Sequence, residues 1–312
     1  MNNIKISFSI KDLENLTGIK AHTIRIWEKR YNLLQPNRSE TNIRTYSLSS
    51  LQKLLNISFL NNSGYKISKI AQLTDQEIPK KVNEIANSTR VEDHAINAFK
   101  MSMLNFDQDL FYKTYEELIR DKSFTEIFHT VFIPLLNDLG LLWQTDTITP
   151  AHEHFLTAHI KQKVLINIER LESLQPRPKT KTFILFLPDN EIHDLGLLFI
   201  NYQLRKKGYH TIFLGDSIPM DSLTHLLQFF DDITFISYFT VYPEENEIIN
   251  YINAFKKALL TQEKTNFIVL GPKLANINIS SFPSKVKSYK SIESLLENIE
   301  PIKTHTLTYS NS

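Results

Sequence analysis

Four short apolar runs in the C-terminal part of the chain constrain its fold more than any other feature. All are rich in residues that favour strands, and they are TFILFL (182–187), TIFLG (211–215), ITFIS (233–237) and NFIVLG (266–271). Segments long enough for a helix separate them. This alternation is typical of a parallel sheet joined by crossover helices. We therefore predict a doubly wound, Rossmann-like α/β domain over residues 180–302.

The residues before this domain follow a helical period instead. Over residues 93–175, Phe, Leu, Ile and Tyr recur at spacings of three and four, as on the buried face of a helix. We expect Gly140 and Pro150 to separate the helices of this bundle. The polar segment QPRPKT (175–180) indicates a linker to the α/β domain.

The first part of the chain indicates a small domain of short helices over residues 1–75. Ser9 and Asp12 form a capping pattern ahead of one helix, Gly18 ends it, and a second helix begins near Lys20. Further elements are expected in this order: a hairpin or wing over 36–47, helices over 48–61 and 67–73, and a polar linker over 76–92 that merges into helix.

Charge is distributed unevenly along the chain, although the net value is only +1. Residues 1–73 hold eleven Lys/Arg and four Asp/Glu, a net of +7, so residues 74–312 carry −6. A basic first quarter on a mildly acidic body indicates that the N-terminal domain meets a polyanion.

A helix, a tight glycine turn and a second helix together form the pattern of a helix-turn-helix. With Ile24, Trp27 and Tyr31 facing inward, the opposite side of the second helix is polar and largely basic. Such a face can enter a major groove of DNA, where arginine reads guanine and both lysine and arginine neutralise phosphate. The predicted DNA-contacting residues, on this helix and the wing, are His22, Thr23, Arg25, Lys29, Arg30, Arg38, Arg44 and Tyr46.

The segment TIRIWEKRYNLLQPNRSETNIRTYS (23–47) closely resembles the DNA-binding domain of the MerR family of transcription regulators. The family pattern is Thr-Ile-Arg, an aromatic residue, Glu, then Tyr, Leu, Pro, Arg and a wing ending in Arg-x-Tyr. The resemblance covers residues 7–75 and departs at Asn42, where many members have glycine; asparagine also tolerates a left-handed turn. It implies a winged helix-turn-helix that binds double-stranded operator DNA as a dimer or tetramer.

The first strand-to-helix junction of the α/β domain carries a histidine beside a carboxylate, in the sequence EIHDLG (191–196). Open α/β sheets bind ligands at such junctions. A carboxylate two residues away can hold one imidazole nitrogen and leave the other for a metal. The stretch resembles the Asp-x-His-x-x-Gly loop of cobalamin-binding proteins, with Glu191 in place of Asp and Gly196 as the glycine. This resemblance implies that His193 is the lower axial ligand of cobalt.

Later positions match the same family. Ser237 ends the third predicted strand, where the family contacts the buried nucleotide base, and Gly271 fits the first glycine of the family's Gly-Gly pair. Pro272 departs from the second glycine, because it adds bulk and removes an N–H donor.

The sequence WQTDTITPAHEHF completes the resemblance. The helical region is similar to the four-helix cap over the upper face of cobalamin, which carries Trp, nine residues and then Glu-His. Trp143, Glu153 and His154 match without a gap. The implied roles are an indole that covers the upper ligand and two polar side chains at its edge. Zinc is not predicted, because Leu156 stands where a second histidine would follow His152.

These observations predict a transcription regulator rather than an enzyme, with adenosylcobalamin as the favoured cofactor. Light-gated members have a histidine directly after the tryptophan, whereas this chain has Gln144, so we expect a weak response to light. Two alternatives stay open. One is a regulator whose sensor domain binds a protein partner without cobalamin, and the other is a corrinoid carrier for methyl transfer.

The composition bounds the setting of the protein. The chain has no cysteine, which excludes disulfides and thiolate metal sites and fits a reducing compartment. It shows neither the apolar run of a signal peptide nor that of a membrane span. A cytoplasmic protein without membrane partners is expected, with residues 303–312 as a tail.

Overall fold

The computed structural model describes residues 7–38, 43–86, 91–144, 147–172 and 180–299. It divides into two compact units, residues 1–160 and 161–312. The division falls inside helix α10 (Pro150–Glu172), so the boundary lies earlier than the linker expected from sequence. Most of that linker, and the expected tail, lie outside the described residues.

The N-terminal domain has the predicted helices and wing. Its elements are β1 (Ser7–Phe8), α1 (Ile10–Thr17), α2 (Ala21–Tyr31), β2 (Asn37–Arg38), β3 (Arg44–Ser47), α3 (Leu48–Asn62) and α4 (Ile67–Ile70). The three strands form an antiparallel sheet in the order β1-β3-β2. Ile24 is fully buried, and Trp27 and Tyr31 pack against the core around Leu33 and Ile57, as predicted. The wing tip with Asn42 lies outside the described residues.

Helix α5 (Glu77–Ala86) occupies most of the segment that the sequence predicted as a linker. Thr74 and Glu77 cap its start, since each backbone N–H donates to the other's side chain. Pro79 lies in the first turn, where its missing N–H costs nothing. Ile78 and Val82 bury the apolar face of the helix. The polar composition hid this short amphipathic pattern, so most of the expected linker is helical.

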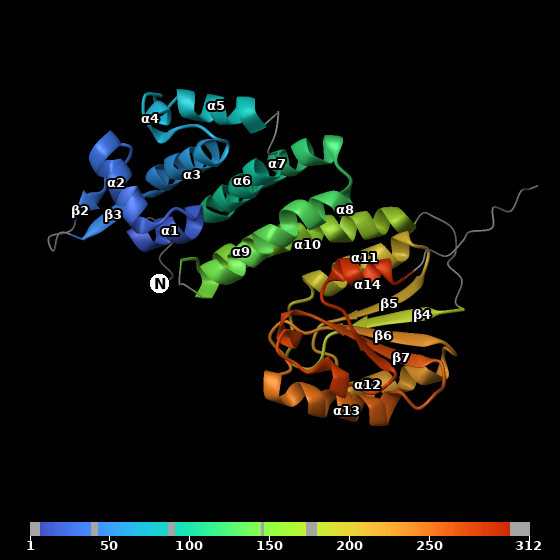
Figure 1. Ribbon diagram of the computed structural model, residues 1–312. Helices are drawn as coiled ribbons and strands as arrows, with labels where there is room; N and C mark the ends of the chain where they lie inside the picture. The colour runs from blue at the N-terminus through green and yellow to red at the C-terminus, as the bar shows by residue number, and fades with distance from the viewer. Residues whose placement is uncertain (1–6, 39–42, 87–90, 145–146, 173–179, 300–312) are drawn as a thin grey trace, which may run out of the picture. The chain divides into compact units, whose positions relative to one another are not determined.

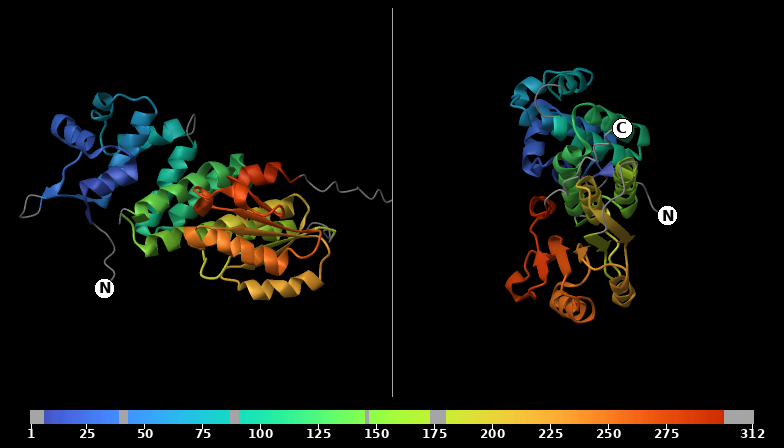
Figure 2. Two further views of the ribbon diagram at one scale, coloured as in Figure 1. Left: turned by 60° about the horizontal axis from the view of Figure 1, so that its bottom comes forward. Right: turned by 90° about the vertical axis from the view of Figure 1, so that its right-hand side faces the viewer.

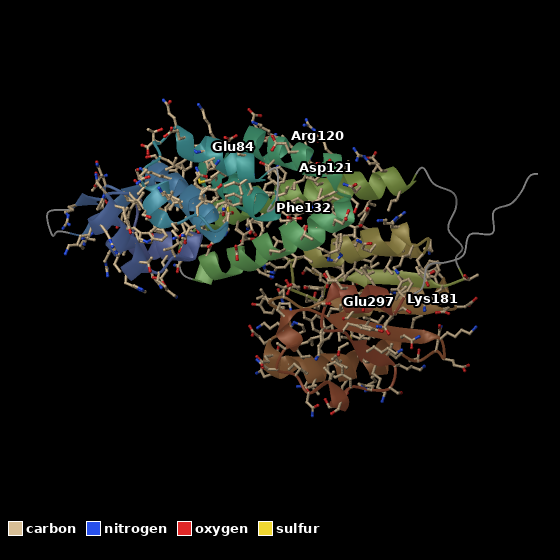
Figure 3. The ribbon with its side chains drawn as sticks, turned by 45° about the horizontal axis from the view of Figure 1, so that its top comes forward. Glu84, Arg120, Asp121, Phe132, Lys181 and Glu297 are labelled. Carbon is tan, nitrogen blue, oxygen red and sulfur yellow. The ribbon has the colours of Figure 1, made fainter. Side chains whose placement is uncertain are left out.

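The helical bundle follows, with aromatic side chains at its centre. Its elements are α6 (Val91–Asn105), α7 (Gln108–Asp121), α8 (Phe124–Ile127), the π-helix η1 (Phe128–Phe132), α9 (Ile133–Gln144) and α10. Phe132, labelled in Figure 3, is buried with its ring centroid 5.5 Å from that of Phe99. Pro150 begins α10 as expected, but Gly140 lies inside α9 rather than between helices. A single exposed glycine weakens a helix by only about 1 kcal/mol.

The C-terminal domain is the predicted doubly wound sheet. Its strands are β4 (Thr182–Phe186), β5 (His210–Gly215), β6 (Ile233–Tyr238), β7 (Thr265–Leu270) and β8 (Val286–Ser288), parallel in the order β5-β4-β6-β7-β8. Helices α11 (Leu195–Lys206) and α14 (Ile292–Glu297) cover one face, and α12 (Met220–Thr224) and α13 (Ile248–Leu259) the other (Figures 1 and 2). The sequence missed β8, because three residues are too few to show a period.

No helix among the described residues is long and apolar enough to cross a membrane.

Candidate functional site

Helix α2 presents the polar face that the sequence predicted. His22, Arg25, Lys29 and Arg30 are exposed, and Thr23 is half-buried beside the core residue Ile24. Three positive charges therefore lie on the solvent side of one helix of eleven residues. This arrangement suits contact with nucleic-acid phosphates and base edges.

Glu14 links α1 to the start of α2, a contact that the sequence did not indicate. Lys20 precedes α2 without capping it through its side chain. Instead the carboxylate of Glu14 accepts the N–H of Ala21 at 3.2 Å, and this hydrogen bond lowers the pKa of Glu14. Gly18 adopts φ +73° between the helices, a conformation that glycine tolerates without strain. Helix α2 is thus held at its first residue, Ala21, by a side chain of α1.

The wing is held to α2 by Glu28. Its carboxylate lies 3.4 Å from Nε of Arg44 and accepts a hydrogen bond from the hydroxyl of Tyr46. Tyr46 is only 1% exposed, and burial together with Glu28 raises its pKa, so the neutral phenol remains a donor to Glu28. Tyr46 therefore supports Arg44 through Glu28, and its predicted contact with DNA stays a prediction. Arg38 is exposed on β2, as expected.

The α/β domain has its topological switch between β4 and β6. From β4 the chain continues to β5 on one side, while β6 pairs with β4 on the other. The loops that follow β4 and β6 diverge, and ligands of open α/β sheets bind in the crevice between such loops. The sequence EIHDLG lies in the first of these loops.

Glu191 joins the two loops at this crevice and is fully buried. Its Oε1 accepts the N–H groups of Ile192 and His193, each at 2.9 Å. Its Oε2 accepts three successive N–H groups of the loop after β6, at 2.6–3.0 Å, from Thr240, Val241 and Tyr242. The sequence indicates the histidine partner but not this second loop, because the contact spans about fifty residues.

His193 is positioned by the same carboxylate. Its Nδ1 lies 2.6 Å from Oε1 of Glu191, and its side chain is 43% exposed. Burial raises the pKa of Glu191, but the hydrogen bonds from His193 and the backbone N–H groups outweigh it and lower the pKa to about 2. An ionised Glu191 keeps the proton on Nδ1, so the lone pair of the neutral ring is on Nε2. This tautomer can bind a metal through Nε2.

Among the other predicted residues, Ser237 fits a ligand-binding role, whereas the two glycines allow close packing within the domain. Ser237 is fully buried, and its Oγ has no hydrogen-bond partner among the described residues. The hydroxyl could therefore form a hydrogen bond with a ligand. Gly271 has φ +119°, and a Cβ there would lie 2.2 Å from the carbonyl oxygen of Phe239. At Gly196 a Cβ would meet the ring of Tyr238 at 3.2 Å. Pro272 begins a short 3-10 helix, where its missing N–H is harmless.

The predicted cap residues lie on α9 and α10. Trp143 is in the last turn of α9, and its side chain is outside the described residues. Glu153 is half-buried and His154 exposed in the first turns of α10. His152 is 1% exposed and stacks on Phe106 at 4.8 Å, with its Nδ1 beside Thr149. Its burial makes His152 a core residue.

We expect Glu191→Gln to destabilise the protein by about 2–4 kcal/mol at pH 7, because an amide NH₂ would face buried N–H donors. Since the folded pKa of about 2 lies below the usual 4.5, the carboxylate stabilises the fold above pH 4.5 and loses this effect as the pH falls toward 2. Urea unfolding at pH 7 and pH 3 should show the gap to wild type narrowing by about 2 kcal/mol. An equal gap at both pH values contradicts this, and the exposed Glu263→Gln is the control.

Comparison with known proteins finds two family matches in residues 8–166. Residues 8–77 match the MerR HTH family regulatory proteins, and residues 95–166 match the B12 binding domain. The chain joins a MerR-type helix-turn-helix to a B12-binding domain. This confirms the two resemblances drawn from the sequence.

Two curated relatives come from Myxococcus xanthus. The HTH-type transcriptional repressor CarH is 28% identical over 223 residues, which cover 70% of this chain and 73% of CarH. The HTH-type transcriptional repressor CarA is 24% identical over 220 residues, 70% of this chain and 71% of CarA. Both are transcriptional repressors, in line with the predicted class.

One solved structure supports the fold. The monomethylamine corrinoid protein of Methanosarcina barkeri matches with a TM-score of 0.54 at 11% identity, over 67% of this chain and all of that protein. At this identity the likeness is one of fold alone.

Proposed function

We propose that this protein is a transcription regulator, a repressor like its relatives, whose operator binding is controlled by cobalamin. The observation that carries the proposal is the pair formed by Glu191 and His193. A buried ionised carboxylate holds Nδ1 at 2.6 Å and leaves Nε2 as the basic nitrogen of a partly exposed ring. That is the arrangement of a metal-ligating histidine with its supporting carboxylate.

Each residue of the cluster has a distinct role in this proposal. His193 would hold cobalt from below through Nε2. Ser237 would contact the buried nucleotide base, and Gly271 would let the loops after β6 and β7 pack together beside it. Trp143, Glu153 and His154 would face the upper ligand. Bound cobalamin supplies a cobalt centre whose upper ligand, adenosyl in the favoured form, changes with chemical state.

The DNA-binding half acts through α2 and the wing. One domain of this size buries too little surface for a tight site, so we propose a dimer or tetramer on a roughly palindromic operator. Cobalamin then controls DNA binding if it binds one oligomeric state of the protein more tightly than another. Equal affinity for both oligomeric states would leave their populations unchanged.

Arg25→Ala should weaken operator binding by about 1–3 kcal/mol, if Arg25 reads a base in the major groove. Operator affinity at fixed salt measures the effect. Arg120→Ala removes an exposed arginine from α7 (Figure 3) and should leave affinity unchanged. Equal affinities of both variants and wild type would remove α2 from the DNA interface.

The deciding experiment measures operator binding by the full chain without cobalamin, with adenosylcobalamin in darkness, and after illumination of that sample. The proposal expects red protein and a difference between the first two conditions. Because Gln144 is a poor cobalt ligand, illumination should change the affinity only weakly. Colourless protein with unchanged DNA binding would favour the partner-binding sensor, which Pro272 motivates. Cobalt-dependent methyl transfer without DNA binding would favour the corrinoid carrier.

A further inference from the structure

Asp194 is a buried carboxylate at the first turn of α11 that does not cap this helix. It occupies the position before Leu195, where an aspartate usually accepts a helix N–H, yet its side chain makes no such bond. Its Oδ2 lies 2.5 Å from Nζ of Lys161 instead. The Asp194 side chain is 10% exposed and that of Lys161 45%, so the carboxylate is the buried partner of a half-exposed ammonium.

The backbone of Asp194 closes the turn that presents His193. Its N–H donates to the carbonyl of Ile192 at 3.0 Å, which leaves His193 at the centre of a tight turn. Its carbonyl accepts the N–H of Leu198 at 2.8 Å, the first bond of α11. Holding the Asp194 side chain therefore restrains the histidine turn from its C-terminal side. Glu191 restrains the same turn from its N-terminal side through the loop after β6.

Lys161 belongs to α10, the helix that also carries Glu153 and His154. It follows His154 by seven residues, about two helical turns, so the two side chains point to nearly the same side of the helix. Any movement along α10 that carries Lys161 also moves the ammonium that holds Asp194.

We propose that Lys161 is a positioning residue for His193, acting through Asp194, which fixes the histidine turn to α10. The inference rests on the proposed function and names the link by which a change felt at Glu153 and His154 reaches the lower cobalt ligand. Lys161 does not itself touch the cofactor in this scheme. Lys161 restrains the turn that presents the imidazole of His193.

Lys161→Met tests the link, since methionine keeps the length of the side chain and removes the ammonium. In the full chain without cobalamin, hydrogen exchange in residues 190–199 should be faster than in wild type by about threefold or more. Cobalamin affinity should fall about threefold to tenfold, less than for a direct supporting partner because the pair is half-exposed. Lys161→Arg should restore most of both effects. Lys256→Met, the loss of an exposed lysine on α13, is the control.

A double-mutant cycle with Asp194→Asn separates positioning from a general loss of stability. Once Asp194 has lost its charge, Lys161→Met should have little further effect on exchange or affinity. Equal effects of Lys161→Met in both backgrounds, or unchanged exchange of the turn, would overturn the proposal. A wild-type protein that binds no cobalamin would refute the proposed function. The hydrogen-exchange measurement needs no cofactor, so it would still test the role of Lys161.

Discussion

Replacing His193 with alanine should lower cobalamin affinity by on the order of a hundredfold or more, the largest effect expected on ligand binding. Losing a partner outside the first shell already costs about tenfold to a hundredfold at metal sites, and this variant removes the proposed ligand itself. The variant also removes one hydrogen bond from the buried Glu191, so we expect a loss of about 1–3 kcal/mol in the free energy of unfolding, with the five backbone N–H bonds to Glu191 retained. Equilibrium dialysis measures the cobalamin affinity of the full chain. The visible spectrum of the bound cofactor reports whether the cobalt ligand has changed.

His225→Ala provides the matched control, because His225 is exposed in the short helix after α12, away from the Glu191 loops. It should bind cobalamin like wild type. A His193→Ala protein that retains affinity and an unchanged spectrum would place the lower ligand elsewhere. The DNA-binding face is separate, so operator binding without cobalamin should persist in both variants.

Local patterns made most of the fold predictable from the sequence. Four of the five strands of the C-terminal sheet show as apolar runs, because parallel strands buried on both faces need them. The capping box of Ser9 and Asp12 and the left-handed Gly18 are also local, and both are present. The failures have local causes as well. Helix α5 was hidden by polar composition, and Gly140 was read as a helix end although nothing in the chain required one there.

The site was predictable only where its chemistry lies within a few residues. The contact between Glu191 and His193 spans two positions and could be foreseen. The three N–H groups after β6 and the ammonium of Lys161 come from distant segments that only the fold brings to this turn. The burial of Tyr46 could not be foreseen for a related reason, since a motif gives a residue type but not its burial.

Gly271→Ala should be the most destabilising single change considered, with a loss of more than about 3 kcal/mol in the free energy of unfolding. The backbone at φ +119° disfavours any side chain, and the new Cβ would lie 2.2 Å from the carbonyl oxygen and 2.7 Å from the nitrogen of Phe239. Both atoms are engaged, since Phe239 N–H donates to Leu270 and its carbonyl accepts from Lys273. The backbone that must move therefore loses hydrogen bonds between the loops after β6 and β7.

Two other glycines separate the causes of this effect. Gly215→Ala has a similar positive φ of +89° but its nearest neighbouring atom is 3.9 Å away, so it should cost only about 1–2 kcal/mol of backbone strain. Gly140→Ala lies in α9 with open space around it and should be neutral or stabilising by up to about 1 kcal/mol. Urea unfolding of the three variants measures the order. If Gly271→Ala loses no more stability than Gly215→Ala, the loops after β6 and β7 are not packed as closely as Phe239 and Gly271 indicate.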